Sequence, residues 1–515
     1  MPDNATTSFK GKWQKLNDKR SSVLERARNC AKVTIPALMP PEGADENTTL
    51  HTPFQGLGAR GINNLAAKLL LTLLPPNTPF FRLQVDDFTL QEMDAADQRA
   101  DAEKALNKIE RAVMGEVEAQ AYRVPVFEAI RLLISTGNSL LYLPDDGGMK
   151  VYRLDQYVIK RDPMGNVLEI LTKEQIHPIA LPDEVREVII SELEESQREE
   201  PLDLFTYIRR EEDAKDKWTV SQQCAGHDIP KSEGTYPLDK SPWIPLRWTS
   251  LAGEDYGRGL VEEYLGDILT LEALTKAITE GATIAARVIF LVNPNGTTRL
   301  KKLAEAANGS VIEGNAEDVS SLQVEKYNDF RIAFEKSQEI KQRLSQAFLL
   351  MESVQRDAER VTAEEIRAMA KELEDSLGGV YSVLSQEFQL PLVNRLMSQM
   401  TKKKRLPDFP KDTVKPSIIT GLEALGRGND LNKLMLFMQF LEPIGPEAMQ
   451  YLNISDMITR GGTALGLDTN GLVKTQEQVQ EEQQAAQEAQ MAQQALPGMA
   501  QEMTKGMVSE GNGNN

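Results

Sequence analysis

Residues 330–400 decide the fold, and they read FRIAFEKSQEIKQRLSQAFLLMESVQRDAERVTAEEIRAMAKELEDSLGGVYSVLSQEFQLPLVNRLMSQM. In the first part of this stretch, apolar residues and one small serine recur three and four positions apart, which places them in one stripe along a helix. The stripe consists of Phe330, Ala333, Ser337, Ile340, Leu344, Ala347 and Met351. A second stripe consists of Ile366, Met369, Leu373, Leu377, Val380, Leu384 and Phe388. The pattern predicts two long helices that need apolar partners elsewhere in the chain or in other copies of it.

A polar segment, Glu352–Arg360, separates the two stripes. It is followed by Thr362-Ala-Glu-Glu365, which matches a capping box with Thr362 as the N-cap and Glu365 three residues later. The sequence therefore predicts a helix, a short charged loop and a second long helix.

The composition is that of an ordinary globular protein. The chain has 515 residues, of which 41% are hydrophobic and 26% charged, and this length predicts two to four domains. Its two cysteines, Cys30 and Cys224, match no disulfide framework, which indicates a reducing compartment. We expect no signal peptide, and the most apolar run, Ile62–Leu74, is too short to span a bilayer. These features predict a soluble protein made inside the cell.

The net charge is −19. It argues against a protein that grips nucleic acid through a broad basic surface, because phosphate neutralisation supplies most non-specific affinity. Two interpretations stay open. The acidic surface either repels phosphates, so that DNA passes without sticking, or simply keeps the protein soluble.

In the N-terminal part, Phe9–Lys32 predicts one basic amphipathic helix. The string Gly56-Leu-Gly-Ala-Arg-Gly61 fits the GxGxxG pattern of dinucleotide sites, which also requires a buried strand before the first glycine. Pro53 argues against such a strand. The competing interpretation is a helix start that the glycines permit.

The middle part predicts helices at 97–121 and 126–136, followed by short strands separated by turn residues. The expected strands are 139–143, 149–154, 157–161, 167–173, 204–210, 217–223 and 242–248, with an acidic helix at 185–197. A group of aspartates in this meander sits in Asp-Gly and Asp-Pro turns, so we predict turn chemistry and no metal site.

The sequence contains few of the residues and motifs that are typical of catalytic sites. The three histidines, His51, His177 and His227, are isolated, which excludes most triad and zinc arrangements. No phosphate-binding loop, GxSxG or HExxH string occurs. We predict no catalytic residue, no metal and no cofactor.

After Trp248 the sequence predicts a long helix at 260–286, rich in acidic residues, and then a compact unit. That unit holds an expected strand at 287–291, a short helix with Arg299, Lys301 and Lys302, and a possible strand at 309–312. A long helix, a small αβ unit and a second long helix describe a stalk with a head. In a ring of copies, such stalks would bury their apolar stripes.

Four strings resemble the head-to-tail connector, or portal, proteins of T7-like short-tailed bacteriophages. They are QRDAERVTAEEI at 355–366, LEDSLGGVYS at 373–382, QLPL at 389–392 and GLEA at 421–424, and the order of elements agrees over nearly the whole chain. The resemblance implies an α+β, mainly α portal fold, assembled as a ring of twelve at one capsid vertex. Double-stranded DNA would be packaged and later ejected through that ring.

The resemblance also implies a division into parts. These are a wing (1–255), a first stem helix (256–286), a clip (287–329), a second stem helix (330–350), a tunnel loop (351–361), a long wing helix (362–406), a crown (407–470) and a disordered Gln/Ala-rich tail (471–515). From the residues alone, 408–420 reads as a proline-punctuated linker within this order.

The resemblance places candidate site residues in three groups. The tunnel loop would present Gln355, Arg356, Glu359 and Arg360 to DNA, with the arginines on phosphates; alternatively, they form salt bridges between subunits. The clip, with Arg287, Arg299, Lys301 and Lys302, would dock the packaging motor and then the tail. The long wing helix would bend at Gly378, Gly379 and Pro391. The basic run Lys402–Arg405 is either a solvated helix end or a further DNA contact.

The partners that the resemblance implies are further copies of the chain, double-stranded DNA, the terminase large subunit, tail adaptor and tail tube proteins, major capsid and scaffolding proteins, and internal core proteins. No membrane is expected. The protein would lie in the virion at the portal vertex, and in the host cytoplasm during assembly. Two other functions remain open: a helical scaffold or adaptor without a DNA channel, and an enzyme that uses the GLGARG segment.

Overall fold

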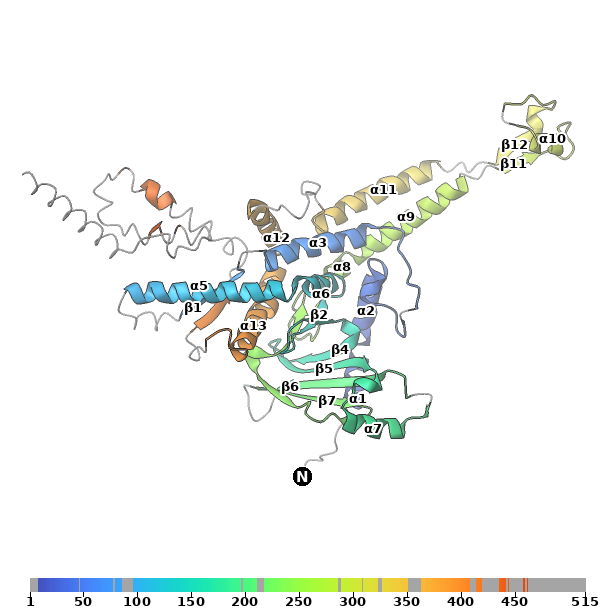
Figure 1. Cartoon of the computed structure of the whole chain (residues 1–515). Helices are drawn as coiled ribbons and strands as arrows, with labels where there is room; N and C mark the ends of the chain where they lie inside the picture. The colour runs from blue at the N-terminus through green and yellow to red at the C-terminus, as the bar shows by residue number, and fades with distance from the viewer. Residues whose placement is uncertain are drawn as a thin grey trace, which may run out of the picture. The chain divides into compact units, whose positions relative to one another are not determined.

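A computed structural model gives the fold of the chain (Figure 1). It describes residues 8–45, 47–76, 79–85, 96–195, 198–210, 217–285, 289–307, 309–322, 327–350, 363–407, 414–418, 435–440, 443, 457–458 and 461. The chain divides into two compact units, Met1–Gly421 and Leu422–Asn515. In the second unit, residues 435–440 are helical. The first unit mixes helices with antiparallel sheets and is mainly helical, as the sequence predicted.

Two N-terminal helices stand where the sequence predicted one. They are α1 (Phe9–Lys19) and α2 (Ser21–Lys32), separated at Arg20. The Arg20 side chain is buried, and its guanidinium donates hydrogen bonds to the backbone carbonyls of Leu154 and Tyr157. The break therefore follows from contacts with residues more than 130 positions away.

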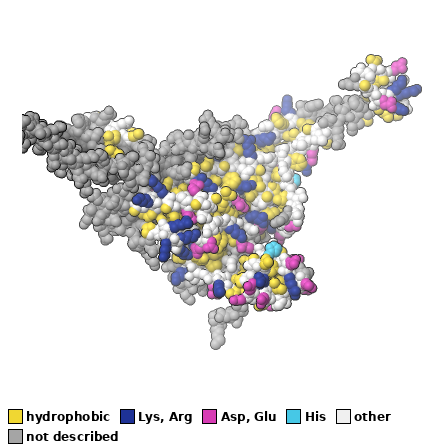
Figure 2. Space-filling view, in the orientation of Figure 1, with side chains coloured by type: hydrophobic (Ala, Val, Ile, Leu, Met, Phe, Trp, Pro, Cys, Tyr) yellow, Lys and Arg dark blue, Asp and Glu magenta, His cyan; other side chains and the backbone are white. Residues whose placement is uncertain are grey.

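Two antiparallel sheets follow the predicted meander closely. A six-stranded sheet has the order β4-β5-β6-β7-β8, with β9 also pairing β7. Its strands are β4 (Tyr157–Arg161), β5 (Val167–Ile176), β6 (Leu202–Arg210), β7 (Lys217–Cys224), β8 (His227–Asp228) and β9 (Gly234–Pro237). A three-stranded sheet joins β10 (Trp243–Arg247), β2 (Asn138–Tyr142) and β3 (Lys150–Tyr152). The helix α7 (Asp183–Glu192) lies between β5 and β6 in the sequence. Figure 2 shows acidic side chains gathered over the region of α7.

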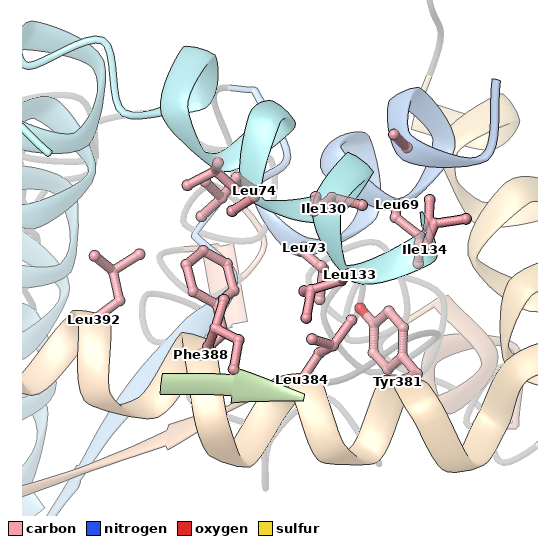
Figure 3. Packing of buried hydrophobic residues seen from close by; sticks show 14 of the residues in the cluster. Leu69, Leu73, Leu74, Ile130, Leu133, Ile134, Tyr381, Leu384, Phe388 and Leu392 are labelled. Carbon is pink, nitrogen blue, oxygen red and sulfur yellow. The ribbon is translucent and has the colours of Figure 1, made fainter. Parts of the chain in front are cut away.

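The largest core is built from helices that are distant in the sequence. It contains residues of α3 (Leu57–Leu73), α5 (Ala96–Ala119), α6 (Arg123–Thr136), α12 (Ala363–Leu384) and α13 (Leu390–Lys402). Figure 3 shows Leu73 and Leu133, from α3 and α6, above Tyr381 and Leu384 of α12. These side chains are almost completely buried. Of the stripe predicted for the long helix, Leu373, Leu384 and Phe388 are thus buried within the same chain.

A helix pair and a small hairpin unit follow β10. The elements are α8 (Leu260–Glu263), α9 (Leu265–Ala285), β11 (Ile289–Val292), α10 (Leu300–Ala304), β12 (Val319–Leu322) and α11 (Tyr327–Ala347). The helices α9 and α11 pack against each other, and β11 pairs only with β12 among the described strands. Short 3₁₀ turns lie at Pro36–Leu38, Leu154–Gln156, Pro178–Ala180, Leu238–Lys240 and Ala316–Asp318.

Two further predictions from the sequence are wrong. Residues 309–312 form no strand, and β11 pairs instead with β12. The expected linker at 408–420 contains a strand, β13 (Val414–Ile418), which pairs antiparallel with β1 (Phe81–Val85). Pro416 lies opposite Leu83 in this two-stranded sheet, where the missing N–H of proline is tolerated. Pairing with a segment some 330 residues earlier decides the structure there.

Candidate functional site

The four residues predicted to face DNA, Gln355, Arg356, Glu359 and Arg360, lie outside the described residues, as does Thr362. The structure does describe both flanks of this segment: α11 with its last turn to Leu350, and α12 from Ala363. The helix α3 contacts both α11 and α12. It therefore holds the chain on either side of the segment.

On the entry side, polar side chains of α3 bind the end of α11. Leu349 has a φ of +51°, a left-handed conformation that ends a helix. Its carbonyl oxygen accepts hydrogen bonds from Asn64 Nδ2 at 3.1 Å and from Lys68 Nζ at 2.9 Å. Lys68 is only 8% exposed, and its positive charge stands at the negative end of the α11 dipole. This contact fixes where the chain leaves α11.

Two glycines of α3 allow it to pack closely against neighbouring side chains. A Cβ atom on Gly61 would lie 2.6 Å from Cγ of Phe348, whose ring is fully buried. A Cβ on Gly58 would lie 2.9 Å from Cγ2 of Thr34. Residues 51–55 form no strand before α3, so the GLGARG string lacks a required part of a dinucleotide site. The competing interpretation, a helix start in which glycines permit close approach, agrees with the structure.

On the exit side, α3 again provides the contacts. Tyr381 Oη donates to the carbonyl of Thr72 at 3.3 Å, and Gln389 Nε2 donates to the carbonyl of Leu73 at 2.8 Å. These carbonyls belong to the last turn of α3, which has no intrahelical donors for them. Figure 3 shows Tyr381 and Leu73 on facing helices. This role of α3 was not predicted from the sequence, although Gly61, Asn64 and Lys68 recur at helical spacing on one face.

The residues predicted as bends lie beside two irregularities of the long helix. Leu377, with φ −131° and ψ 23°, departs from helical geometry directly before Gly378 and Gly379. A Cβ on either glycine would meet nothing within 4 Å, so packing does not require them. A π-helical turn, Ser385–Gln389, comes directly before α13, whose first turn contains Pro391.

Buried arginines hold the π-helical turn and α13 to the sheets. The Glu387 carboxylate accepts hydrogen bonds from the backbone N–H of Arg247 at 3.1 Å and from the Arg247 Nε at 3.0 Å. It also forms an ion pair with Arg161, whose Nη1 lies 3.8 Å from Glu387 Oε1. Arg395 Nη2 donates to the Leu143 carbonyl at 3.0 Å and pairs with Asp145 at 2.7 Å. This part of the helix is therefore tied by ion pairs as well as by apolar contacts.

The α9–α11 pair buries one face and exposes another. Ser337, Ile340 and Leu344 are buried, as the stripe predicted, together with Ile268 and Leu271 of α9. An ion pair between Asp267 and Arg343, 2.9 Å long, joins the two helices. Leu269, Ile284, Ile332 and Phe334 remain between 48% and 62% exposed. Figure 2 shows hydrophobic side chains over these helices.

The hairpin unit is closed by one carboxylate. Asp318 accepts hydrogen bonds from the backbone N–H of Thr298 at 3.0 Å, from its hydroxyl at 3.1 Å and from the hydroxyl of Thr297 at 3.2 Å. The Thr298 N–H bond, followed by the hydroxyl bonds, lowers the pKa of Asp318. Three predicted docking residues, Arg299, Lys301 and Lys302, are exposed on and beside α10. Arg287 lies outside the described residues.

We also searched the described part of the chain for a metal site and for a membrane-spanning helix. There, no group of three or more His, Cys, Asp or Glu side chains is placed to hold a metal ion. The aspartates of the meander have other partners: Asp145 binds Arg395, Asp155 pairs with Arg153, and Asp162 accepts from the backbone of Asn166. None of the helices within the described ranges has the length and apolar character needed to cross a bilayer.

Comparison with known proteins gives a consistent result. The family model described as "Bacteriophage head to tail connecting protein" matches residues 6–473. The portal protein of Escherichia phage T7 is 42% identical over 485 residues, covering 93% of this chain and 90% of that protein. The portal protein of Enterobacteria phage T3 is 43% identical, covering 92% and 89%. Among solved structures, a chain in the neck of a gene transfer agent particle matches with 12% identity and a TM-score of 0.34, covering 80% and 90%.

Proposed function

This chain belongs to the bacteriophage head-to-tail connecting protein family, and we propose that it forms the portal ring, the channel for double-stranded DNA at one capsid vertex. Family membership and 42–43% identity to two portal proteins over nearly the whole chain support this function. The protein is a structural component of the virion and acts as a conduit rather than as an enzyme.

The parts take the roles that the family resemblance implies. In a ring of twelve, α9 and α11 form the stem around the channel, and their exposed apolar side chains meet neighbouring subunits. The unit between β11 and β12 is the clip, which docks the terminase motor during packaging and the tail afterwards. Capsid, scaffolding and internal core proteins contact the outer and upper surfaces. Assembly takes place in the host cytoplasm.

One observation supports the proposal that the segment with Arg356 and Arg360 contacts DNA. Residues 351–362 contain Arg356 and Arg360 and follow an α11 end that Asn64 and Lys68 bind through a buried carbonyl. Twelve copies of a segment that begins at this fixed point would form a ring of arginines at the channel axis. The net charge of −19 per chain would make the rest of the wall repel phosphates, so DNA would slide with few contacts.

Particle mass tests the ring. Twelve chains of 57.4 kDa give about 689 kDa, which native mass spectrometry measures directly. A mass within one subunit of this value supports the portal ring. A stable monomer or dimer in the presence of capsid and scaffolding proteins would refute it.

An arginine variant tests the channel contact. Arg356→Ala combined with Arg360→Ala should leave rings of unchanged mass but lower the yield of packaged or retained DNA. The matched control is Arg198→Ala with Lys231→Ala, which removes two exposed bases elsewhere. Rings that fail to assemble would show that the two arginines join subunits instead. ATP hydrolysis by the purified chain would contradict the assignment as a conduit.

A further inference from the structure

An exposed segment of the clip, residues 311–313, has strand-like residues but no strand partner among the described residues. Val311 is 100% exposed and Ile312 is 39% exposed. For residues 311–313, no backbone hydrogen bond to any other described residue is present. β-branched residues favour the strand conformation because they pack well on a pleated surface. The sequence predicted a strand here, and the single chain does not use it.

The clip sheet has room for such a strand. It consists of β11 and β12 alone, so each of its strands has one edge without a partner among the described residues. A two-stranded sheet is marginally stable by itself, and an open edge is a template for pairing with another chain. Leu291 of β11 is 50% exposed, which leaves apolar surface beside that edge.

We propose that residues 311–313 of one subunit add as a third strand to an open edge of the β11–β12 sheet of the neighbouring subunit. The inference rests on the proposed ring. A closed ring needs a contact between two different surfaces, and an exposed donor segment and an open sheet edge are such surfaces. Main-chain hydrogen bonds would supply the affinity, and the β-branched side chains the register.

The charges of the clip agree with this pairing. The donor side carries the exposed acids Glu313 and Glu317, and the acceptor unit carries the exposed bases Arg299, Lys301 and Lys302. Figure 2 shows acidic and basic side chains together on the part that contains α10. Opposite charges on the two sides favour contact between neighbours over contact between two donor segments.

Cysteine cross-linking of assembled rings tests the proposal. Val311→Cys is combined with Ser320→Cys on β12 or with Leu291→Cys on β11, and the rings are treated with a short bifunctional maleimide. The native Cys30 and Cys224 are buried, and burial raises the pKa of Cys30 to about 12, so neither should react. We expect a ladder of covalent multimers on a denaturing gel with one of the two pairs.

The control pair is Val311→Cys with Met164→Cys, which is 86% exposed in a turn of the wing and should give no ladder beyond that of Val311→Cys alone. A cross-linked band at the mass of one chain would mean that the segment folds onto its own sheet and would overturn the proposal. So would rings of normal mass that cross-link at neither edge. If no rings form even for the unmodified chain, the proposed portal function fails instead.

A second pair of variants tests the backbone contribution. Val311→Pro removes a backbone N–H, whereas Val311→Thr keeps both the N–H and the β-branched shape. We expect Val311→Pro rings to dissociate at a lower urea concentration than Val311→Thr rings, as measured by native mass spectrometry. Equal dissociation midpoints would count against strand exchange through this segment.

Discussion

The substitution Gly61→Ala tests whether α3 positions the start of the segment that we propose as the tunnel loop. The added methyl group would lie 2.6–3.0 Å from three atoms of Phe348, inside a fully buried contact. Overpacking of this kind costs about 1–3 kcal/mol. Replacing a glycine by alanine within a helix also contributes roughly 0.5–1 kcal/mol of stability, so the two effects must be separated.

Gly115→Ala provides that separation. Gly115 lies inside α5, and a Cβ there would meet nothing within 4 Å. It therefore reports the helix contribution alone. We expect the free energy of unfolding of Gly61→Ala to fall about 1–3 kcal/mol below that of Gly115→Ala.

The assay is urea unfolding of both variants at one protein concentration, followed by circular dichroism. Trypsin cleavage after Arg356 and Arg360 gives a local readout, since displacement of Phe348 should loosen the adjoining segment and speed cleavage in Gly61→Ala only. If both variants unfold at the same urea concentration and are cleaved at the same rate, α3 does not position the loop.

Two further predictions follow from buried and hydrogen-bonded charges. Arg395→Met should lower the free energy of unfolding by about 1.5–3 kcal/mol, because it removes charged hydrogen bonds at a 1% exposed side chain. Lys402→Ala breaks only an exposed pair with Asp145 and should cost about 0–1 kcal/mol. Urea unfolding measures both losses, and equal losses would contradict the reasoning. The lowered pKa of Asp318 means that its contribution to clip stability is present above the unfolded pKa of about 3.9 and is lost as pH falls through the folded value. Hydrogen exchange at the Thr298 amide, corrected for intrinsic rates, should therefore accelerate on acidification, and Asp318→Asn should lack this pH dependence.

The strands of the meander were predictable because their signals are local. Tyr157–Arg161 has the predicted bounds, since β-branched and aromatic residues form a short run that ends at the Asp162-Pro turn. The break at Arg20 was not predictable, because arginine is a good helix former and the carbonyls that bind it lie far along the chain. Strand β13 was missed for a similar reason: its proline reads as a linker until its partner β1 is known.

The sequence offers candidate site residues, but it does not show which contacts position the segment that carries them. The charged loop between two apolar stripes is visible in the sequence, as is its resemblance to the connector family. The contacts of α3 are not visible, because Gly61, Asn64 and Lys68 meet residues about 280 positions later. Gly61 also belongs to a nucleotide-binding pattern, a competing explanation that Pro53 argued against and that the lack of a strand at 51–55 removed.

Four bases in the described part of this chain are buried and stabilise the fold from inside. Arg20, Lys68, Arg247 and Arg395 are each less than 9% exposed and bind backbone carbonyls or carboxylates inside the fold. Glu110, Glu116 and Asp318 are buried to a similar degree, so burial removes about as many acids as bases from the described surface. Substitution of a buried base should lower stability first, whereas substitution of Arg356 and Arg360 should lower DNA retention in rings of normal stability.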